Sequence, residues 1–462
     1  MALNIVIMAA GKGTRMKSAL PKVLHKLAGR SLLQHVLDCT APLQAAQRIV
    51  ITGHGAEQVE AATAASGARF VRQMPQLGTG HAIQQTVPVL PDDGTTLILN
   101  GDVPLIRSET ARRLAEACAD RALVLLTIDL ADPTGYGRIV REGGRADGAV
   151  QAIVEHKDAT PEQRLLREGY TGMMAAPTAL LKRWVMALSN QNAQGEYYLT
   201  DIVAMAVAEG VPVLGLKAAD ETEVLGVNSP LQLADLERRY QRRQAEALME
   251  AGVRLADPAR FDLRGELVCG QDVEIDINSL FEGRVELGDG VRIGANCVIR
   301  NARIAAGARI HEFTHIDGES AGVSIGEGAL IGPFARLRPG AQLGAEVHIG
   351  NFVEVKNSQL GRGAKANHLA YLGDAVIGAG VNIGAGTITC NYNGVNKSTT
   401  TIGDGAFIGS NSALVAPVTI GEGATIGAGS TIGKDAPAGK LTVARARQQT
   451  VDGWQRPVKK AP

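Results

Sequence analysis

The sequence predicts two domains of different construction: an α/β domain with a mostly parallel sheet over residues 1–229, and a parallel β-helix of hexapeptide repeats over residues 251–441. Three observations predict this architecture. Short apolar runs alternate with helical patterns in the first half of the chain. Aliphatic residues recur at every sixth position in the second half. Glycine supplies 55 of the 462 residues and aromatic residues only 3%, a composition that suits tight turns around small aliphatic layers.

The α/β domain is predicted from its apolar runs. We expect buried strands at residues 5–8, 48–51, 96–99 and 122–128, with helices such as 110–119 and 178–188 between or after them. Strands that run parallel need crossover helices, which cover both faces of the sheet. Ligands of such sheets bind at the carboxyl ends of the strands, so a site is expected in the loops after Met8 and after Leu99.

A charged helix is predicted over residues 230–250, between the two domains. Pro230 is a favourable first residue for a helix, and Gly252 follows its last turn. Its many charges predict a solvated linker helix. At the other end of the chain, residues 442–462 leave the repeat, and we expect them to form a partly ordered tail.

The β-helix is predicted from a period of six. The aliphatic positions fall into three runs: Leu287, Ile293 and Ile299; Ile325, Ile331, Leu337, Leu343, Ile349 and Val355; and Ile402, Ile408, Leu414, Ile420, Ile426 and Ile432. A period of six fits neither a single strand nor an α-helix. It is typical of a parallel β-helix in which each hexad forms one short strand and one turn, with the aliphatic side chain pointing inward.

The repeat is interrupted at two places. Residues 389–398 are polar and form a predicted loop, and the register also slips over residues 311–322. Interruptions of a repeat map to loops, often on the binding face.

Composition and charge exclude some classes. Lys+Arg and Asp+Glu are both 47, so the net charge is zero, which argues against a nucleic-acid partner. No apolar stretch is long enough to span a membrane. The five cysteines are scattered and odd in number, which fits neither a disulfide framework nor a zinc site. We therefore expect a cytoplasmic protein.

A glycine-rich turn follows the first strand. Gly11, Gly13 and the cations Lys12, Arg15 and Lys22 fit neither a dinucleotide fingerprint nor a P-loop. Backbone N–H groups with three cations suit a triphosphate, although a simple tight turn has the same glycines.

A second loop, Asn100-Gly101-Asp102, follows the strand at 96–99. A carboxylate at this edge of the sheet suits a magnesium ion on phosphate oxygens, or it merely begins a turn.

Potentially catalytic side chains also gather around the interrupted part of the β-helix. His368 is suited to act as a general base, and Glu354 is a candidate to orient its imidazole. Arg338, Lys356 and Lys397 are cations that would hold an anion, or solvated edges of the coil. The polar residues Tyr371, Asn382, Asn391 and Tyr392 lie in or beside the same stretch.

Several motifs together resemble the family of bifunctional N-acetylglucosamine-1-phosphate uridyltransferase/glucosamine-1-phosphate acetyltransferases. In the first half these are Met-Ala-Ala-Gly-Lys-Gly-Thr-Arg-Met with Pro21-Lys22, Gln-Leu-Gly-Thr-Gly-His-Ala at 76–82, Gly101-Asp102 with Pro104-Leu105, Gly-Tyr-Gly-Arg-Ile at 135–139, Val-Glu-His-Lys-Asp at 154–158 and Asn-Ala-Gln-Gly-Glu-Tyr-Tyr at 192–198. The hexapeptide repeat completes the resemblance, which extends nearly from end to end. It implies a Rossmann-like nucleotidyltransferase domain followed by a left-handed β-helix, assembled as a homotrimer with sites built from neighbouring subunits.

For uridyl transfer, the resemblance implies Mg²⁺ held by Asp102 and Asn228, with Arg15 and Lys22 neutralising the triphosphate. The implied substrates are UTP and N-acetylglucosamine-1-phosphate. The family commonly has asparagine at the position of Tyr170 and an aromatic residue at that of Asn100. The binding residues implied on this side are Met8, Ala9, Ala10, Gly11, Lys22, Gln73, Gly78, Thr79, Asn100, Gly101, Asp102, Gly137, Glu155, Tyr170 and Asn228.

For acetyl transfer, the resemblance implies acetyl-CoA and glucosamine-1-phosphate as substrates, with His368 as the base. It implies a sugar-phosphate site formed by Arg338, Lys356, Tyr371, Asn382, Asn391, Tyr392 and Lys397, and an acetyl-CoA groove lined by Ala385, Ser410, Ala428 and Arg445.

Two other functions stay open from the sequence. The chain could be a sugar-1-phosphate nucleotidyltransferase whose β-helix is only a scaffold, or a sugar-nucleotide binding module without activity. A scaffold has no need of His368 beside three cations, and a binding module gives no account of Asp102 and Asn228. These residues favour the bifunctional enzyme.

Overall fold

The computed structural model describes residues 2–459 and divides into two compact units, Met1–Tyr240 and Gln241–Pro462. The boundary falls inside helix α8 (Pro230–Glu250), the helix expected at 230–250. The last three residues of the expected tail, 460–462, lie outside the described residues. Among residues 2–459, none of the helices combines the length and the apolar character needed to cross a membrane.

The first unit has a mixed, mostly parallel sheet at its centre, with strand order β11-β7-β10-β6-β1-β4-β5 and β8 and β9 attached through β10. Strand β1 runs parallel to both β4 and β6, while β10 runs antiparallel to β6 and β7. A small hairpin, β2 and β3, lies outside this sheet. The strands are β1 (Leu3–Ala9), β2 (Lys26–Leu27), β3 (Arg30–Ser31), β4 (Gln47–Thr52), β5 (Arg69–Arg72), β6 (Thr95–Asn100), β7 (Leu123–Asp129), β8 (Gly137–Arg141), β9 (Val150–Val154), β10 (Glu168–Pro177) and β11 (Val213–Lys217).

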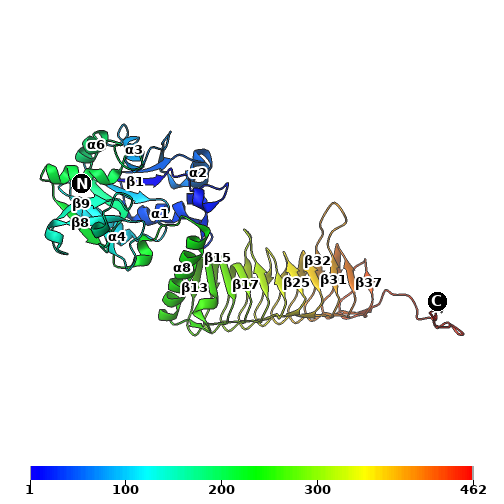
Figure 1. The fold of residues 1–462 in the computed structure, drawn as a ribbon. Coiled ribbons are helices and arrows are strands. Elements are labelled where there is room, and N and C mark those ends of the chain that lie inside the picture. The colour runs from blue at the N-terminus through cyan, green and yellow to red at the C-terminus, as the bar shows by residue number, and fades with distance from the viewer. Residues whose placement is uncertain (1, 460–462) are drawn as a thin grey trace. The chain divides into compact units, whose positions relative to one another are not determined.

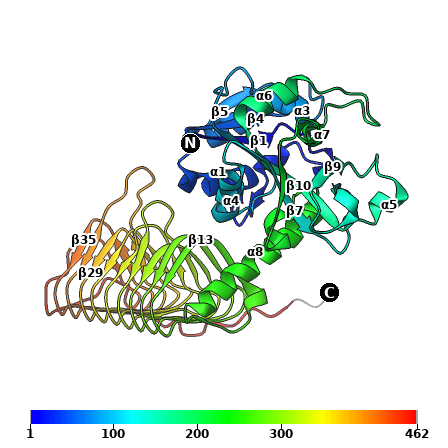
Figure 2. The same cartoon turned by 90° about the vertical axis from the view of Figure 1, so that its left-hand side faces the viewer.

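Helices cover both faces of this sheet, as the sequence predicts. Along β1, Ile5 and Ile7 face one core while Val6 faces the other, because successive side chains of a strand point to opposite faces. Helices α1, α2 and α4 pack on the first core, and α3, α6 and α7 on the second. Figure 2 shows α1 and α4 on one side of the sheet and α3 and α6 on the other. The helices are α1 (Leu32–Thr40), α2 (Ala56–Thr63), α3 (Thr79–Gln84), α4 (Ser108–Cys118), α5 (Pro161–Arg164), α6 (Thr178–Met186) and α7 (Ile202–Ala208).

Helix α8 is not solvated on all sides, which corrects the expectation drawn from its charges. Leu236 is buried in a small cluster of the first unit, and Ala245 is buried in the core of the second. Between them, the buried amide of Gln241 donates to the carbonyl of Leu263 (2.9 Å) and accepts from its N–H (2.8 Å). Gln241 thus satisfies polar backbone groups of the first coil, which no earlier coil covers.

The second unit is a parallel β-helix, seen in Figure 1 as a stack of coils. Each coil has three short strands and three corners, and all the aliphatic residues of the six-residue repeat point inward, none of them more than 4% exposed. The arrangement is consistent with the expected left-handed β-helix. In the first coils, two of the three faces are continuous. The long strands β13 (Phe261–Cys269), β15 (Ser279–Leu287) and β17 (Val298–Ile304) each run through both of them.

We number the three faces in chain order within a coil. Face 1 contains β12 (Arg254–Leu255), β14 (Glu274–Ile275), β16 (Arg292–Ile293), β18 (Arg309–Ile310), β21 (Leu330–Ile331), β24 (His348–Asn351), β27 (Lys365–His368), β30 (Asn382–Ile383), β33 (Phe407–Ile408), β36 (Thr425–Ile426) and β38 (Leu441–Thr442). Face 2 contains β19 (His315–Asp317), β22 (Arg336–Leu337), β25 (Glu354–Lys356), β28 (Tyr371–Gly373), β31 (Ile388–Cys390), β34 (Ala413–Val415) and β37 (Thr431–Ile432). Face 3 contains β20 (Val323–Ile325), β23 (Gln342–Leu343), β26 (Gln359–Leu360), β29 (Ala375–Ile377), β32 (Thr400–Ile402) and β35 (Val418–Ile420), and the long strands are β13 (Phe261–Cys269), β15 (Ser279–Leu287) and β17 (Val298–Ile304).

Both predicted interruptions lie at the corner between faces 2 and 3. One is the segment between β19 and β20, and the other is the longer loop between β31 and β32, which projects from the coil (Figure 1). The remaining coils keep their corners tight with residues in the left-handed backbone region, among them Asn357 and Asp374 at this same corner.

Candidate active sites

The first candidate site lies where β1 and β6 end. Gly13 has a φ of 60°, and a Cβ atom there would meet Cβ of Lys22 at 2.7 Å, so glycine allows the turn to pack directly against that lysine. The N–H of Gly101 donates to the carbonyl of Met8 (2.9 Å), which ties the loop after β6 to the end of β1. The two loops that the sequence singles out therefore meet at one edge of the sheet.

These loops line a cleft of about 480 Å³. Most of the residues implied for the nucleotide lie along it, together with several that the sequence reasoning did not assign. The expected residues are Met8, Ala9, Ala10, Gly11, Lys12, Gly13, Arg15, Lys22, Gln73, Gly78, Thr79, Asn100, Asp102 and Asn228, and the additional ones are Thr14, Val23, Gln76, Ala82 and Glu196. Gln76 and Glu196 belong to motifs that carry the family resemblance, and membership of these motifs is the sequence feature that could have identified them as cleft residues.

A carboxylate and an amide oxygen face one cation in this cleft. The ammonium of Lys22 pairs with Oδ2 of Asp102 and donates to Oδ1 of Asn228 at 3.1 Å. The N–H of Val227 donates to the carbonyl of Asp102 (2.9 Å), which holds the neighbouring Asn228 beside it. Two hard oxygen atoms that already bind a cation have the chemistry that Mg²⁺ requires. Across the described residues 2–459, no cluster of three or more His, Cys, Asp or Glu side chains is arranged for a metal, so phosphate and water would have to complete the coordination.

A second pocket, of about 230 Å³, adjoins the cleft and shares Met8, Thr79 and Asn100 with it. Its other lining residues include three expected for the sugar, Gly137, Glu155 and Tyr170, and also Gly135, Tyr136, Thr171, Gly172, Leu199 and Thr200, which were not assigned. A Cβ atom on Gly137 would meet Cγ2 of Ile153 at 2.8 Å, so glycine keeps this wall open.

Polar groups in this second pocket are strongly desolvated. Burial raises the pKa of Glu155, and the hydroxyl of Thr200 donates to this carboxylate (3.1 Å). Tyr170 is 8% exposed, and its hydroxyl has no hydrogen-bond partner among the described residues. The side-chain amide of Asn100 donates to the carbonyl of Thr171 (3.3 Å). Groups of this kind suit a neutral ligand rich in hydroxyls.

The second candidate site lies along the corner between faces 1 and 2 of the β-helix. One residue just before this corner in each of five successive coils forms what we call the edge column: Asn351, His368, Ala385, Ser410 and Ala428. The carbonyls of Asn351, His368, Ala385 and Ser410 each accept from a backbone N–H of the next coil, at 3.1, 3.4, 2.7 and 2.8 Å. After the last strand, β38, the guanidinium of Arg445 donates to the carbonyl of Ala428 (2.6 Å).

The edge column therefore brings together the histidine and three of the four residues implied for acetyl-CoA, and the fourth, Arg445, contacts the last residue of the column. Beyond His368, every side chain of the column is small, so this edge of the coil has little side-chain bulk between the imidazole and Arg445.

The imidazole of His368 has a different partner from the one expected. Its Nδ1 lies 2.8 Å from Oδ1 of Asn351, one coil earlier in the edge column. Because an amide oxygen only accepts, Nδ1 carries the proton and Nε2 is the basic nitrogen. Glu354 lies on face 2, where it pairs with Arg338 (2.8 Å) and Arg336 (3.3 Å). The prediction that Glu354 orients the imidazole is therefore wrong in this chain.

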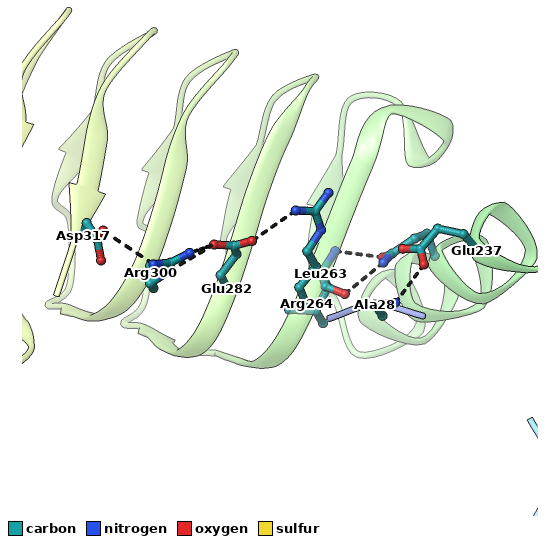
Figure 3. A network of polar contacts seen from close by, with 8 residues as sticks. Ala28, Glu237, Leu263, Arg264, Glu282, Arg300 and Asp317 are labelled. Atoms are coloured by element: carbon teal, nitrogen blue, oxygen red, sulfur yellow. Dashed lines mark hydrogen bonds and ion pairs between the residues drawn. The ribbon is translucent and has the colours of Figure 1, made fainter. Parts of the chain in front are cut away.

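A column of charges on face 2 explains the cations implied for the sugar phosphate. Figure 3 shows its first part, in which Arg264, Glu282, Arg300 and Asp317 alternate in sign, with contacts of 3.1, 3.0 and 3.6 Å. By strand register, the next positions in the column are Arg338, Lys356 and Gly373. Two cations thus follow one another, and the position where an anion would come next has no side chain.

The cations of this site repel one another. The Arg338 guanidinium and then the Lys397 ammonium lower the pKa of Lys356. The lysine from the projecting loop therefore lies close to the two cations of face 2. The phenol of Tyr371 lies flat over Gly373, because a Cβ atom there would meet its hydroxyl at 2.3 Å. Glycine at this position makes room for both the aromatic ring and an anion.

Two remaining polar residues lie at the far corner of face 2, and one lies on face 1. Asn391 donates to Oδ2 of Asp374, and Tyr392 pairs with Lys397 across the base of the projecting loop. Asn382 is on strand β30 of face 1. The structure therefore does not bring all the implied acetyltransferase residues of one chain together: Asn382 points from a different face of the coil.

An α/β domain with a cation-lined cleft at the ends of its strands, followed by a hexapeptide β-helix with a histidine at one edge, defines a two-domain transferase. Comparison with known proteins is specific. A family model described as a MobA-like NTP transferase domain matches residues 5–169, and one described as bacterial transferase hexapeptide (six repeats) matches residues 267–301, 322–357 and 399–434.

Curated relatives match along the whole chain. Proteins named bifunctional protein GlmU are 72% identical in Methylibium petroleiphilum, 65% in Paracidovorax citrulli and 58% in Cupriavidus pinatubonensis. Each alignment covers 99% of this chain and at least 99% of the relative. The chain belongs to the GlmU family, and it is a bifunctional enzyme with N-acetylglucosamine-1-phosphate uridyltransferase and glucosamine-1-phosphate acetyltransferase activity.

Proposed function

We propose that the β-helix acetylates glucosamine-1-phosphate and that the first unit then converts the product to UDP-N-acetylglucosamine, with the residues described above in the following roles. The observation that carries this proposal is the edge column, in which a histidine held through Nδ1 stands at the head of a row of small side chains. An inert scaffold has no physical need for that arrangement.

In acetyl transfer, the sugar amine attacks the thioester carbonyl of acetyl-CoA. The carbon–sulfur bond breaks, CoA leaves as the thiolate, and Nε2 of His368 takes the proton from the attacking nitrogen. Asn351 holds the ring with Nδ1 protonated. Arg338, Lys356 and Lys397 hold the phosphate at the vacant anion position of the charge column, and Tyr371, Asn382, Asn391 and Tyr392 contact the sugar. Ala385, Ser410, Ala428 and Arg445 line the acetyl-CoA groove.

In uridyl transfer, a phosphate oxygen of N-acetylglucosamine-1-phosphate attacks the α-phosphorus of UTP in line, and pyrophosphate leaves. Arg15 and Lys22 neutralise the triphosphate, while Glu155 and Gly137 hold the sugar. Asp102 and Asn228 hold Mg²⁺, a role supported by the cation that their oxygens already share. The bound metal supplies charge neutralisation on the phosphates. Positioning and electrostatics suffice for this chemistry, and no covalent protein intermediate is needed.

We further propose that the enzyme is a homotrimer whose acetyltransferase sites combine residues of neighbouring chains. Face 2 extends from Leu369 to Asp374, six residues whose first and last Cα atoms lie about 16 Å apart in extended chain. Asn382 lies on face 1, away from the cations of face 2, so we assign its contact with the sugar to the site of a neighbouring chain. This geometry supports shared sites.

A ladder of exposed aromatic residues supports self-association at the corner between faces 1 and 2. Phe313, Phe334 and Phe352 are 51, 46 and 59% exposed, and their rings stack at 4.9 and 5.4 Å between centroids. All three have positive φ, a backbone conformation that is costly for a bulky residue. An exposed apolar ladder kept at this cost suits burial against a second copy of the chain. The five free thiols and the two proposed co-substrates support a cytoplasmic location.

One pair of variants tests the division of roles. We expect His368→Ala to abolish CoA release from glucosamine-1-phosphate and acetyl-CoA, with pyrophosphate release from UTP and N-acetylglucosamine-1-phosphate within a few-fold of normal. Asp102→Ala should do the reverse, and chelation of divalent cations should stop only pyrophosphate release. If no CoA is ever released by the unmodified enzyme, the β-helix is a scaffold. If either variant loses both activities, the two sites are not separate.

A further inference from the structure

Three polar side chains stack at the corner between faces 2 and 3, and we call them the corner ladder: Asn357, Asp374 and Asn391. The strand register places them at the same position of three successive coils. Nδ2 of Asn357 donates to Oδ1 of Asp374 (2.5 Å), and Nδ2 of Asn391 donates to Oδ2 of the same carboxylate. The aspartate thus accepts one amide from the coil before it and one from the coil after it.

The corner ladder ends on both sides, because the adjacent positions of the column have no polar side chain. Gly340 lies before Asn357, and a Cβ atom there would meet Oδ1 of Asn357 at 3.0 Å. Ala416 takes the same position one coil after Asn391. Among residues 2–459, Asp374 is the only hydrogen-bond partner of the side-chain amide of Asn391. The orientation of this amide therefore depends on Asp374.

An aspartate in the middle of the ladder gives both amides the same polarity. A carboxylate only accepts hydrogen bonds, so each asparagine turns its NH₂ group toward Asp374 and its oxygen away from it. A third amide in the middle would donate to one neighbour and accept from the other, so one of the two outer amides would be reversed. Asp374 thus determines that Asn391 presents Oδ1, an acceptor, beyond the end of the ladder.

The corner ladder adjoins the cations of face 2. Asn391 stands at the start of the projecting loop that also carries Lys397. The Arg338 guanidinium and then the Lys397 ammonium lower the pKa of Lys356, and the Asp374 carboxylate acts on it in the opposite direction. The ladder therefore ends at the edge of the cation site implied for the sugar phosphate.

We propose that Asp374 is a positioning residue for acetyl transfer, which holds the Asn391 amide so that Oδ1 accepts a hydroxyl or amine hydrogen of glucosamine-1-phosphate. A reversed amide would present its N–H to that donor instead. This inference rests on the proposed function, in which Asn391 contacts the sugar. The negative charge of Asp374 itself opposes the binding of an anionic substrate, so its benefit to binding comes from the orientation of Asn391.

The test measures KM for glucosamine-1-phosphate and kcat for CoA release in four variants. Asp374→Gly removes the carboxylate and accepts the positive φ of 49° at this position. Asn357→Gly is the matched control, because it removes the other amide of the ladder and leaves Asn391 held. Asn391→Ala tests the sugar contact itself. Thermal unfolding followed by circular dichroism reports whether the coils of each variant are intact.

The double variant Asn357→Asp/Asp374→Asn is a rescue. It moves the carboxylate one coil earlier, where it accepts the NH₂ group of the new amide at position 374. The oxygen of that amide then accepts from Asn391, which keeps its orientation. The net charge of the ladder is also unchanged.

We expect Asp374→Gly to raise KM by about three- to tenfold, the range of one lost hydrogen bond, with kcat changed by about twofold at most. The double variant and Asn357→Gly should keep KM within about twofold. Charge alone predicts the opposite sign for Asp374→Gly, so an unchanged or lower KM in this variant would overturn the inference.

The controls separate orientation from a purely structural role of the ladder. An equal rise of KM in Asn357→Gly or in the double variant would mean that stacking of the coils matters and orientation of Asn391 does not. Both outcomes leave the proposed function intact if Asn391→Ala still raises KM. If Asn391→Ala leaves KM unchanged, the sugar contact of the proposed function fails, and the inference fails with it.

Discussion

Removing the amide of Asn351 should slow acetyl transfer without stopping it. In Asn351→Ala, the imidazole of His368 loses the acceptor that fixes Nδ1 as the protonated nitrogen, at 2.8 Å. The ring then divides its time between two tautomers and several orientations, of which only some present a basic Nε2 to the sugar amine. The histidine itself is still present, so the chemistry remains available.

The size of the effect follows from the kind of bond that is lost. A neutral hydrogen bond contributes about 0.5–1.5 kcal/mol net, because water replaces it at an exposed site such as this one. Since about 1.4 kcal/mol corresponds to a factor of ten, kcat for CoA release should fall by about two- to tenfold. His368→Ala removes the base altogether and should cost about 10²–10⁴. The two variants are therefore separated by at least an order of magnitude.

The assay is CoA release at saturating glucosamine-1-phosphate and acetyl-CoA, with pyrophosphate release from the first unit as a check on the integrity of the protein. Asn351→Asp retains an acceptor oxygen in the same place and should stay within a few-fold of the unmodified enzyme. Normal kcat in Asn351→Ala would mean that the contact does not orient the base. A loss as large as that of His368→Ala would mean that Asn351 takes part in the reaction itself, and the roles drawn from the edge column would be wrong.

Three further outcomes are expected. Glu155→Gln should stabilise the first unit at neutral pH, because the raised pKa of Glu155 in the folded state means that ionisation of this carboxyl opposes folding. The cost is absent below the ordinary glutamate pKa of about 4.3 and grows as the pH rises through the pKa of the folded state. Urea unfolding should accordingly show a larger difference between variant and unmodified protein at pH 7.5 than at pH 5, and a difference that shrinks toward higher pH would contradict this sign. Gly373→Ala should displace the ring of Tyr371 and raise KM for glucosamine-1-phosphate several-fold, with CoA release at saturation changed less and uridyl transfer not at all; an unchanged KM would mean that the ring position is immaterial. Phe334→Gly removes an exposed ring and a strained φ, so sedimentation should show dissociation of the oligomer at higher protein concentration than normal, whereas an unchanged association constant would exclude the aromatic ladder from the contact.

Most of the architecture could be predicted because it depends on periodicity. The six-residue repeat determines which side chains point inward, and the apolar runs determine the central strands of the first unit. The antiparallel strand β10 could not be predicted in the same way, because nothing in its ten residues states which neighbours it pairs with. Helix α8 was expected at the right residues but with the wrong environment, since its charges conceal the buried positions Leu236 and Ala245.

The error at Glu354 has a specific physical origin. Closeness in sequence to Lys356 suggested closeness to His368, but in a β-helix the neighbours of a residue lie one coil away. The register of β24 and β27 pairs Asn351 with His368, a separation of 17 residues. Counting one coil back from the histidine would have found its partner. Gln76, Thr200 and the other unassigned lining residues reach their pockets only through the packing of loops, which no period describes.

The charge column on face 2 restricts how this coil could have changed in length. A solenoid gains or loses whole coils with little effect on its core, because each coil contacts only its neighbours. Loss of the single coil that carries Asp317 would seat Arg300 next to Arg338 and place three cations in succession, whereas loss of two coils would seat Glu282 there and restore the alternation. On the N-terminal side of the acetyltransferase site, the β-helix can therefore gain or lose coils without electrostatic penalty only in pairs. This parity should be visible among related β-helices of different length. Any redesign of the number of coils would have to respect it.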